Sequence, residues 1–146
     1  MAIRRDDFPL PDLTDEQTAP FYAGAGAGEL RLPVCRTCGR FVWYPAATCP
    51  HCGGEGTSWV PTSGLGTLFT WAVVRRPFLS AFEEMVPFVT GLVALDEDPS
   101  VRIVTLIVDV EPDALVAEAP MQATFRPLRF PTVPDREVVA PMFRPR

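Results

Sequence analysis

The sequence predicts a mainly β fold in three parts: a short N-terminal helical segment, a four-cysteine ribbon and a five-stranded barrel. Three observations predict this fold. All four cysteines form two Cys-x-x-Cys pairs, a later series of short runs is rich in β-branched and aromatic residues, and Gly, Pro and Asp separate those runs. We expect an N-terminal arm with helices over 1–28, the ribbon over 29–62, and the barrel with a proline-rich C-terminal tail over 63–146.

Residues 1–13 are polar and proline-punctuated, which indicates an extended arm. The segment Thr14-Asp15-Glu16-Gln17 fits a capping box, so a helix is expected to begin there. Pro20 would interrupt that helix unless a second helix begins at Thr18 or Ala19 and places the proline in its first turn. A helix this short is not stable alone, so we expect its aromatic residues, Phe21 and Tyr22, to lie on the ribbon or on a partner.

The cysteines predict a metal site. Cys35 and Cys38 form the first pair, Cys49 and Cys52 the second, and glycine follows each pair directly. Two such turns bring four thiolates together in a closed tetrahedral site, which is the arrangement of structural zinc and keeps no open position for water or substrate. His51 lies inside the second turn, where we expect it to be a solvated loop residue.

Two apolar runs frame this site. Residues 29–34 alternate polar and apolar and predict a strand that leads into the first cysteine pair. Residues 41–45, Phe-Val-Trp-Tyr-Pro, predict a second strand-like run between the pairs. We expect its aromatic side chains to shield the four thiolates from water.

From Gly64 onward the pattern becomes all-β, with a hinge or bulge expected at Gly64-Leu65-Gly66. The expected strands are Thr67–Arg75, Phe88–Leu95, Val101–Val110, Gln122–Phe125 and Val138–Phe143. Five short strands fit a barrel of the oligonucleotide/oligosaccharide-binding (OB) type, and a meander sandwich is the competing interpretation. Residues 76–87 interrupt the strands, either as a lid over one barrel mouth or as a partner-facing loop. The proline-rich tail is expected to wrap across a surface.

Charge, apolar runs and missing motifs reduce the number of function classes to be considered. The chain has 146 residues and a net charge of −5, which is unfavourable for binding phosphate backbones, so nucleic acid is not the expected partner. No apolar run is long enough to span a bilayer, and the N-terminus lacks an apolar signal core, so a cytoplasmic location without a membrane partner is expected. We find no nucleophile elbow, phosphate loop or dinucleotide fingerprint, and we assign no catalytic residue.

The chain resembles the family named "domain of unknown function thirty-five". The similarity lies in residues 30–39, in Tyr44-Pro45 followed by residues 49–53, in residues 63–71 and in the strand 91–96. The resemblance implies an N-terminal helical segment, a rubredoxin-like zinc ribbon and an OB-fold. Its zinc ligands correspond to Cys35, Cys38, Cys49 and Cys52.

The same resemblance implies a non-catalytic accessory subunit that docks on a thiolase-superfamily enzyme and supports binding of its acyl-CoA thioester. The expected partner is a thiolase-like aldolase, a carbon-carbon lyase that shortens steroid side chains, in complexes where a hydratase domain can also occur. Three alternatives stay open: a subunit bridging an acetyl-CoA thiolase and a hydroxymethylglutaryl-CoA synthase, a nucleic-acid-binding ribbon/OB module, and a rubredoxin-like iron electron carrier. The spacing of ten residues between the cysteine pairs is short for the last.

Two further sets of residues are candidates for binding. Arginines can meet the phosphates of coenzyme A, and exposed aromatic residues can meet a partner protein. The candidate CoA-binding residues are Arg75, Arg76, Arg126 and Arg129. The candidate partner-docking residues are Phe21, Tyr22, Phe78, Phe82 and Phe143.

Overall fold

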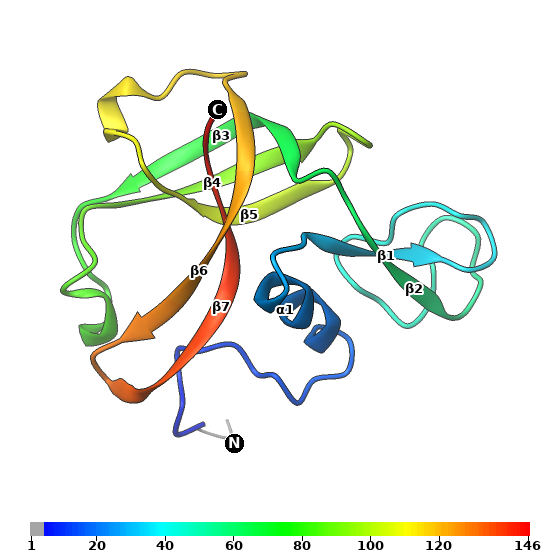
Figure 1. Cartoon of the computed structure of the whole chain (residues 1–146), viewed down its shortest axis with the longest axis horizontal. Coiled ribbons are helices and arrows are strands. Elements are labelled where there is room, and N and C mark those ends of the chain that lie inside the picture. Colours follow the sequence, from blue (N-terminus) through cyan, green and yellow to red (C-terminus); the bar gives the residue numbers. More distant parts are fainter. Residues whose placement is uncertain (1–4) are drawn as a thin grey trace.

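The computed structural model describes residues 5–146 and shows a short helix, a two-stranded ribbon and a closed five-stranded barrel (Figure 1). The predicted mainly β fold is therefore confirmed. The first four residues of the expected N-terminal arm lie outside the described part. The elements are α1 (Ala19–Gly26), β1 (Arg31–Cys35), β2 (Thr57–Pro61), β3 (Leu65–Val74), η1 (Ser80–Phe82), β4 (Phe88–Leu95), β5 (Arg102–Ile107), η2 (Pro112–Ala114), β6 (Pro120–Phe130) and β7 (Val133–Pro145).

The barrel strands follow the order β3-β4-β5-β7-β6, and β3 pairs with both β4 and β6 to close the ring. Strands β5 and β7 run parallel and pair only at Ile107 and Phe143. A meander would place each strand beside its sequence neighbours, so this order excludes the meander sandwich and fits the OB-fold.

The glycines at the start of β3 allow this closure. Gly64 has φ +72°, a conformation that glycine adopts without steric cost. A Cβ atom on Gly66 would lie 2.5 Å from the carbonyl oxygen of Ala94 on β4. The β-bulge lies further along the strand, between Leu68 and Thr70. Of the expected hinge or bulge at residues 64–66, the bulge is therefore not found there.

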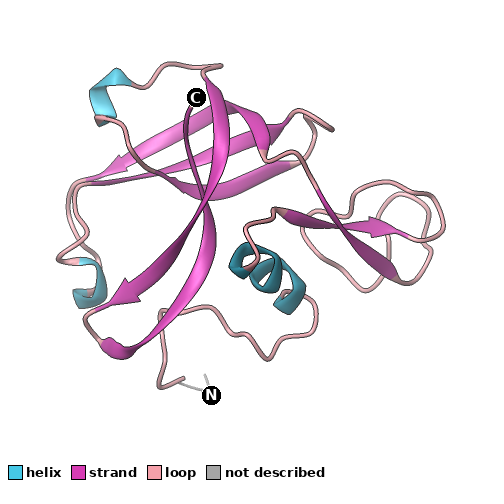
Figure 2. Cartoon of the chain, viewed as in Figure 1, coloured by secondary structure: helices cyan, strands magenta, loops and turns pink. Residues whose placement is uncertain are grey.

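The C-terminal part differs from the expectation. Two short strands and a surface-wrapping tail were predicted, but β6 and β7 are the longest strands and form one hairpin with register from Met121–Pro145 to Phe130–Val133. Figure 2 shows this hairpin extending beyond the other barrel strands. The tail is therefore part of the barrel wall.

The prolines fit because of their place in the ladder. The carbonyl oxygens of Phe143 and Pro141 accept hydrogen bonds from the backbone N–H of Val108 and the hydroxyl of Thr105, so these β7 residues direct their backbone groups away from β6. Pro145 on β7 lies two residues beyond Phe143, and Pro127 on β6 lies opposite Val139, two residues before Pro141, so both belong to the same alternating set of positions in the β6–β7 pairing. A missing N–H at such positions removes no bond of the β6–β7 ladder, whereas in the interior of a sheet it would.

The main core joins the ribbon and the barrel. Leu68, Ile103 and Phe143 from barrel strands lie in one buried cluster with Leu30 and Leu32, which precede and begin the ribbon. Each fully buried side chain of this kind contributes about 1.5–3 kcal/mol relative to exposure. The ribbon and the barrel therefore share a core, and helix α1 lies between the ribbon and β7 (Figure 2).

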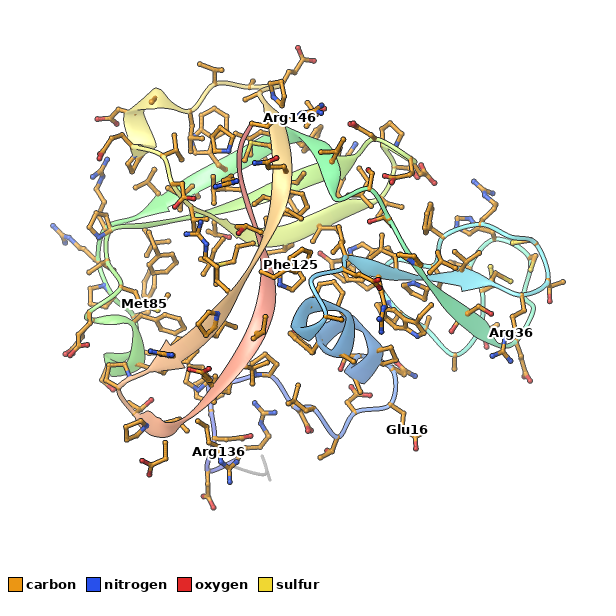
Figure 3. The ribbon with its side chains drawn as sticks, in the orientation of Figure 1. Glu16, Arg36, Met85, Phe125, Arg136 and Arg146 are labelled. Carbon is orange, nitrogen blue, oxygen red and sulfur yellow. The ribbon has the colours of Figure 1, made fainter. Side chains whose placement is uncertain are left out.

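A second buried cluster fills the space beside the hairpin. It contains Leu10 from the N-terminal arm, Ala81 from η1, and Phe130, Val133 and Val138 from the hairpin. Figure 3 shows Met85 of the 76–87 loop on the hairpin side of the barrel. The loop therefore packs over the hairpin, while Phe78 stays exposed. The interpretation of residues 76–87 as a partner-facing loop stays a prediction.

The helix begins at the later of the two predicted sites. Thr14 donates to the carboxylate of Asp12 from both its backbone N–H and its hydroxyl, at 2.9 and 2.6 Å, so the capping box does not form. Residues 13–14 and 16–18 are turns. Thr18 is the N-cap of α1, and Pro20 lies in the first turn. The local Asp-x-Thr turn satisfies the threonine that the capping box would have used. Over residues 5–146, no helix is long and apolar enough to cross a membrane.

Candidate metal centre and binding residues

Strands β1 and β2 pair antiparallel and hold the two cysteine turns at the end of the ribbon. The two turns repeat the same hydrogen bonds: the N–H of Gly39 donates to the carbonyl of Cys35, and the N–H of Gly53 donates to that of Cys49, each at 2.9 Å. Both glycines have φ +75°, which explains why glycine follows each pair. The sequence repeat is therefore a repeat of backbone geometry.

The four sulfur atoms lie within 4.8 Å of one another. The Sγ atoms of Cys35 and Cys52 are 3.7 Å apart, and those of Cys38 and Cys49 are 3.8 Å apart. Sulfur atoms that surround zinc tetrahedrally at about 2.3 Å are separated by about 3.8 Å, whereas a disulfide needs about 2.05 Å. The site fits structural zinc held by all four cysteines, as predicted.

Backbone amides support these thiolates. The N–H groups of Thr37, Cys38, His51 and Gly54 donate to sulfur atoms at 3.3–3.5 Å. Such bonds stabilise the negative charge of four thiolates gathered around one cation. A metal ion would therefore meet a site that is already oriented to receive it.

Hydrogen bonding and burial shift the pKa values of two of the four thiols in opposite directions. The amide of Cys38 is the largest cause that lowers the pKa of the Cys35 thiol to about 6. The pKa of Cys52 is raised to about 11, because desolvation and its neighbouring sulfur atoms outweigh the amide of Gly54, which lowers it. Because a metal ion binds cysteine as the thiolate, binding of a divalent cation would release protons from this site.

The shielding of the metal site differs from the expectation. Residues 41–45 form a single bridge, Val34–Phe41, rather than a strand. Val42 is completely buried in a small cluster with Cys35 and Cys49, while Trp43 points the other way and packs against the barrel core. The ring of His51 hydrogen-bonds the carbonyl of Phe41 at 3.2 Å, so this exposed residue also holds the loop.

Trp43 joins the ribbon to strand β5 and to helix α1, a role that the sequence analysis missed. Its indole Nε1–H donates to the carbonyl of Arg102 on β5 at 3.1 Å, and its ring lies 5.4 Å from that of Phe21 on α1. The only signal in the sequence is an aromatic residue between the cysteine pairs. The ribbon is thereby fixed to the barrel at the beginning of β5.

The four candidate arginines lie in different surroundings. Arg126 forms a two-bond ion pair with Asp109, and Arg129 donates to Glu137 at 2.6 Å. Arg75 is 3.8 Å from Asp113, with both side chains largely exposed. Among the described residues no carboxylate lies within 4.0 Å of Arg76.

The ion pair at Asp109 extends to a residue that was not predicted. Arg144 on β7 approaches Asp109 at 3.5 Å, and the amide oxygen of Gln122 can accept from the same guanidinium at 2.9 Å. Arg126 and then Arg144 hold the pKa of Asp109 below its usual value by hydrogen bonding and charge. No pattern in the sequence links these four residues, because they meet only through the barrel register.

The candidate docking residues are also divided. Phe143 is completely buried in the barrel core, so it does not reach the surface in this structure. Phe82 packs against Phe88 and Phe130, with ring centroids 6.0 and 5.5 Å apart, and Phe21 and Tyr22 are partly buried against the two cores. Phe78 is 94% exposed. Partner docking therefore stays a prediction, for which Phe78 is the most accessible of the five.

Two family models match adjoining parts of the chain. The model described as the rubredoxin-like zinc ribbon domain of ChsH2 matches residues 23–58, and the model described as its C-terminal OB-fold domain matches residues 59–126. The domain limits predicted from sequence, at 28/29 and 62/63, stay predictions.

Curated relatives are similar over much of this chain. The "Probable enoyl-CoA hydratase alpha subunit" of Thermomonospora curvata is 29% identical over 137 residues, which are 94% of this chain and 40% of the relative. A "DUF35 domain-containing scaffold protein" of Pyrococcus furiosus is 32% identical over 91 residues, which are 62% of this chain and 65% of the relative. The chain thus spans less than two thirds of the length of these two proteins.

Two solved structures are similar in fold. A chain of the "Ltp2-ChsH2(DUF35) aldolase" matches with a TM-score of 0.77 and 29% identity, over 92% of this chain and 98% of that chain. A DUF35 protein of Sulfolobus solfataricus matches with a TM-score of 0.54 and 13% identity, which shows the fold alone. With both domain models matched in succession over residues 23–126, the chain belongs to the DUF35 family, in which a ChsH2-type zinc ribbon is followed by a ChsH2-type OB-fold domain.

Proposed function

We propose that this chain is a non-catalytic accessory subunit that docks on a thiolase-like enzyme and supports acyl-CoA binding and complex assembly. The observation that carries the proposal is the match to a chain of the Ltp2-ChsH2(DUF35) aldolase, which extends over 98% of that chain. A match over nearly the whole of that chain covers the ribbon and the barrel together, which supports a similar place for this chain in a complex. The steroid side-chain acyl-CoA aldolase is the proposed partner.

The metal centre supports a structural role in this complex. All four cysteine sulfur atoms converge on one point, and backbone amides occupy the space around them. A cation held by four thiolates has no free position for a substrate oxygen. Zinc would therefore fold the ribbon, and the chemistry would belong to the partner.

The arginines differ in how readily they could meet CoA phosphates. Arg126 and Arg129 are each in close ion pairs and would have to exchange a carboxylate for a phosphate. Arg75 holds Asp113 only at 3.8 Å on an exposed surface, where such pairs are weak. We therefore place the first CoA contacts at Arg75 and its neighbour Arg76.

Purification of the tagged chain from its source cell tests the proposal. We expect a thiolase-superfamily subunit in matching amounts and one zinc ion per chain. When the chain is added to that subunit, aldol cleavage of an acyl-CoA should be restored. The isolated chain should show no aldol cleavage. Activity of the isolated chain would contradict the accessory role, and recovery without any thiolase-superfamily protein would contradict the partnership.

A second candidate function is a scaffold that bridges a thiolase and a hydroxymethylglutaryl-CoA synthase. The names of two archaeal relatives, from Pyrococcus furiosus and Methanothermobacter thermautotrophicus, favour it, since both are called scaffold proteins. The same purification distinguishes the two: a bridging subunit would recover both enzymes, and an aldolase subunit only one.

A further inference from the structure

One face of the barrel carries an apolar surface that the proposed function does not yet use. Leu92 on β4 is paired with Val104 on β5 and with Thr70 on β3, and Thr90 is paired with Leu106. Residues directly opposite on neighbouring strands point to the same side of a sheet. The residues between them, such as Val93, point into the buried core. We call this side of β3–β4–β5 the outer sheet face.

Side chains in the outer sheet face are open to solvent. Val104 is 57% exposed and Phe69, at the β3 bulge, is 49% exposed. At the far end of the face, Val74, Phe78 and Phe88 help to line an almost entirely apolar hollow of about 140 Å³, and Phe78 is 94% exposed. Large exposed apolar side chains that adjoin one another mark a contact surface more often than isolated ones do.

Arg102 places one positive charge at the other end of this face. Its guanidinium carbon lies 3.8 Å from the centroid of the Phe69 ring, and no carboxylate of the described residues lies within 4.0 Å of it. The acids of the adjacent turn have other partners: Asp96 faces Arg146, Glu97 accepts from the N–H of Ser63, and Asp98 accepts from Ser100. The N–H groups of Arg102 are therefore available to an incoming carboxylate.

A second copy of this chain is a poor occupant of the outer sheet face. A face-to-face dimer with its twofold axis along the strands would set Arg102 against its own copy, because a twofold interface joins equal patches. Each copy also brings a net charge of −5. Like charges across an interface oppose association.

The geometry points to an amphipathic helix of a partner subunit as the occupant, with its apolar stripe along β4 and a carboxylate at the end that meets Arg102. The eight residues of β4 extend about 26 Å at about 3.3 Å per residue. A helix of about 18 residues has that length, and its diameter matches the width of three strands at about 4.8 Å spacing. The apolar hollow beside Phe78 would take one anchoring side chain.

This inference deepens the proposed function, because it rests on that function for the identity of the partner and assigns the surface that meets it. Synthetic peptides test the surface without the partner. The probe is a helical peptide of about 18 residues with leucines along one stripe and two glutamates at one end. A second peptide carries lysines in place of the glutamates.

Fluorescence anisotropy with the full chain gives the affinities. We expect the glutamate peptide to bind about threefold to fivefold more tightly than the lysine peptide, which is the upper part of the range of about 1.4-fold to fivefold for an exposed ion pair. Arg102→Glu should reverse this preference, and it leaves the Trp43 bond intact because that bond uses the backbone carbonyl. Val104→Glu should weaken both peptides about tenfold or more, because it buries an unpaired carboxylate.

The matched control is Val116→Glu, since Val116 is 62% exposed and lies in the connection between β5 and β6. It adds the same charge and should leave both affinities unchanged. Melting temperature and zinc content of each variant establish that it is folded. Equal binding of the two peptides, no binding of either, or equal loss in both valine variants would overturn the inference.

The complex separates this inference from the proposed function. If a thiolase-superfamily subunit is recovered, Val104→Glu should weaken its binding about tenfold while Val116→Glu does not. Binding of that subunit with no effect of Val104→Glu would leave the accessory function standing and overturn the surface. If no such subunit is recovered, the peptides decide the surface alone. Sedimentation as a dimer that Val104→Glu dissociates would assign the face to a second copy and also overturn the inference.

Discussion

Replacement of Trp43 tests how the ribbon is fixed to the barrel. Its indole Nε1–H donates to the carbonyl of Arg102 at 3.1 Å, its ring packs beside Phe21, and it adjoins the main core. Trp43→Phe keeps most of the packing and removes the hydrogen bond, which should lower the free energy of unfolding by about 0.5–1.5 kcal/mol. Trp43→Ala also removes the packing. A fully buried tryptophan would lose about 3–5 kcal/mol, so this partly buried one should lose about 2–3 kcal/mol.

The assay is urea unfolding followed by circular dichroism, together with the melting temperature. For a chain of this size, about 2–4 °C of melting temperature corresponds to 1 kcal/mol, so Trp43→Ala should melt about 5–10 °C lower. Trp59→Phe is the matched control: Trp59 also lies in the ribbon, on β2, and no side-chain hydrogen bond of its indole is present among the described residues. We expect it to change stability by less than about 0.5 kcal/mol. Equal effects of the two Trp→Phe variants would refute a role of the Trp43 hydrogen bond in fixing the ribbon to the barrel.

Three further predictions concern single substitutions, and one of them has a control substitution. Cys38→Ser should leave three thiolates, and competition with a chelator should show a zinc affinity about tenfold lower or weaker still. A zinc affinity equal to that of the wild type would contradict ligation by four cysteines. Gly66→Ala should destabilise the barrel by about 2 kcal/mol or more because its Cβ would meet a backbone oxygen at 2.5 Å, whereas Gly26→Ala meets nothing within 4 Å and should stabilise α1 by about 0.5–1 kcal/mol. The pKa of Asp109 in the folded chain lies below its usual value. Its pairing with Arg126 therefore stabilises the fold at pH values above the unfolded pKa of about 3.9, and this stabilisation is lost as the pH falls through the folded pKa. Asp109→Asn should remove this part of the acid sensitivity, and an acid-unfolding curve equal to that of the wild type would contradict the prediction.

Residues with a fixed chemical demand were predictable from sequence. Four thiolates need one cation and two tight turns, so cysteine spacing and the glycines at 39 and 53 defined the metal centre. The strands β4 and β5 were predictable because their alternating apolar residues face a buried core. In these cases the local pattern and the tertiary environment require the same residues.

Residues whose role depends on distant partners were not predictable. Thr14 has the capping-box pattern, but its hydroxyl donates to the carboxylate of Asp12 instead of serving the helix. The prolines of β7 suggested an irregular tail, and only the register shows that Pro141 and Pro145 lie where a backbone N–H would face away from β6. The cluster of Asp109, Arg126 and Arg144 needs residues from two strands and one loop. Composition and spacing do not carry that information.

The shared core leads to a last prediction, on metal removal. Leu30 and Leu32 adjoin the ribbon in sequence, yet they are 1% and 0% exposed within the barrel core. If chelation unfolds the ribbon and withdraws both side chains, the barrel loses about 3–6 kcal/mol of burial energy. A chelator should therefore lower the melting temperature of the single cooperative transition of the whole chain, recorded by circular dichroism of the β-sheet. Added zinc should restore that temperature. Two separate transitions, with the barrel melting at its original temperature, would show instead that the ribbon folds independently of the barrel.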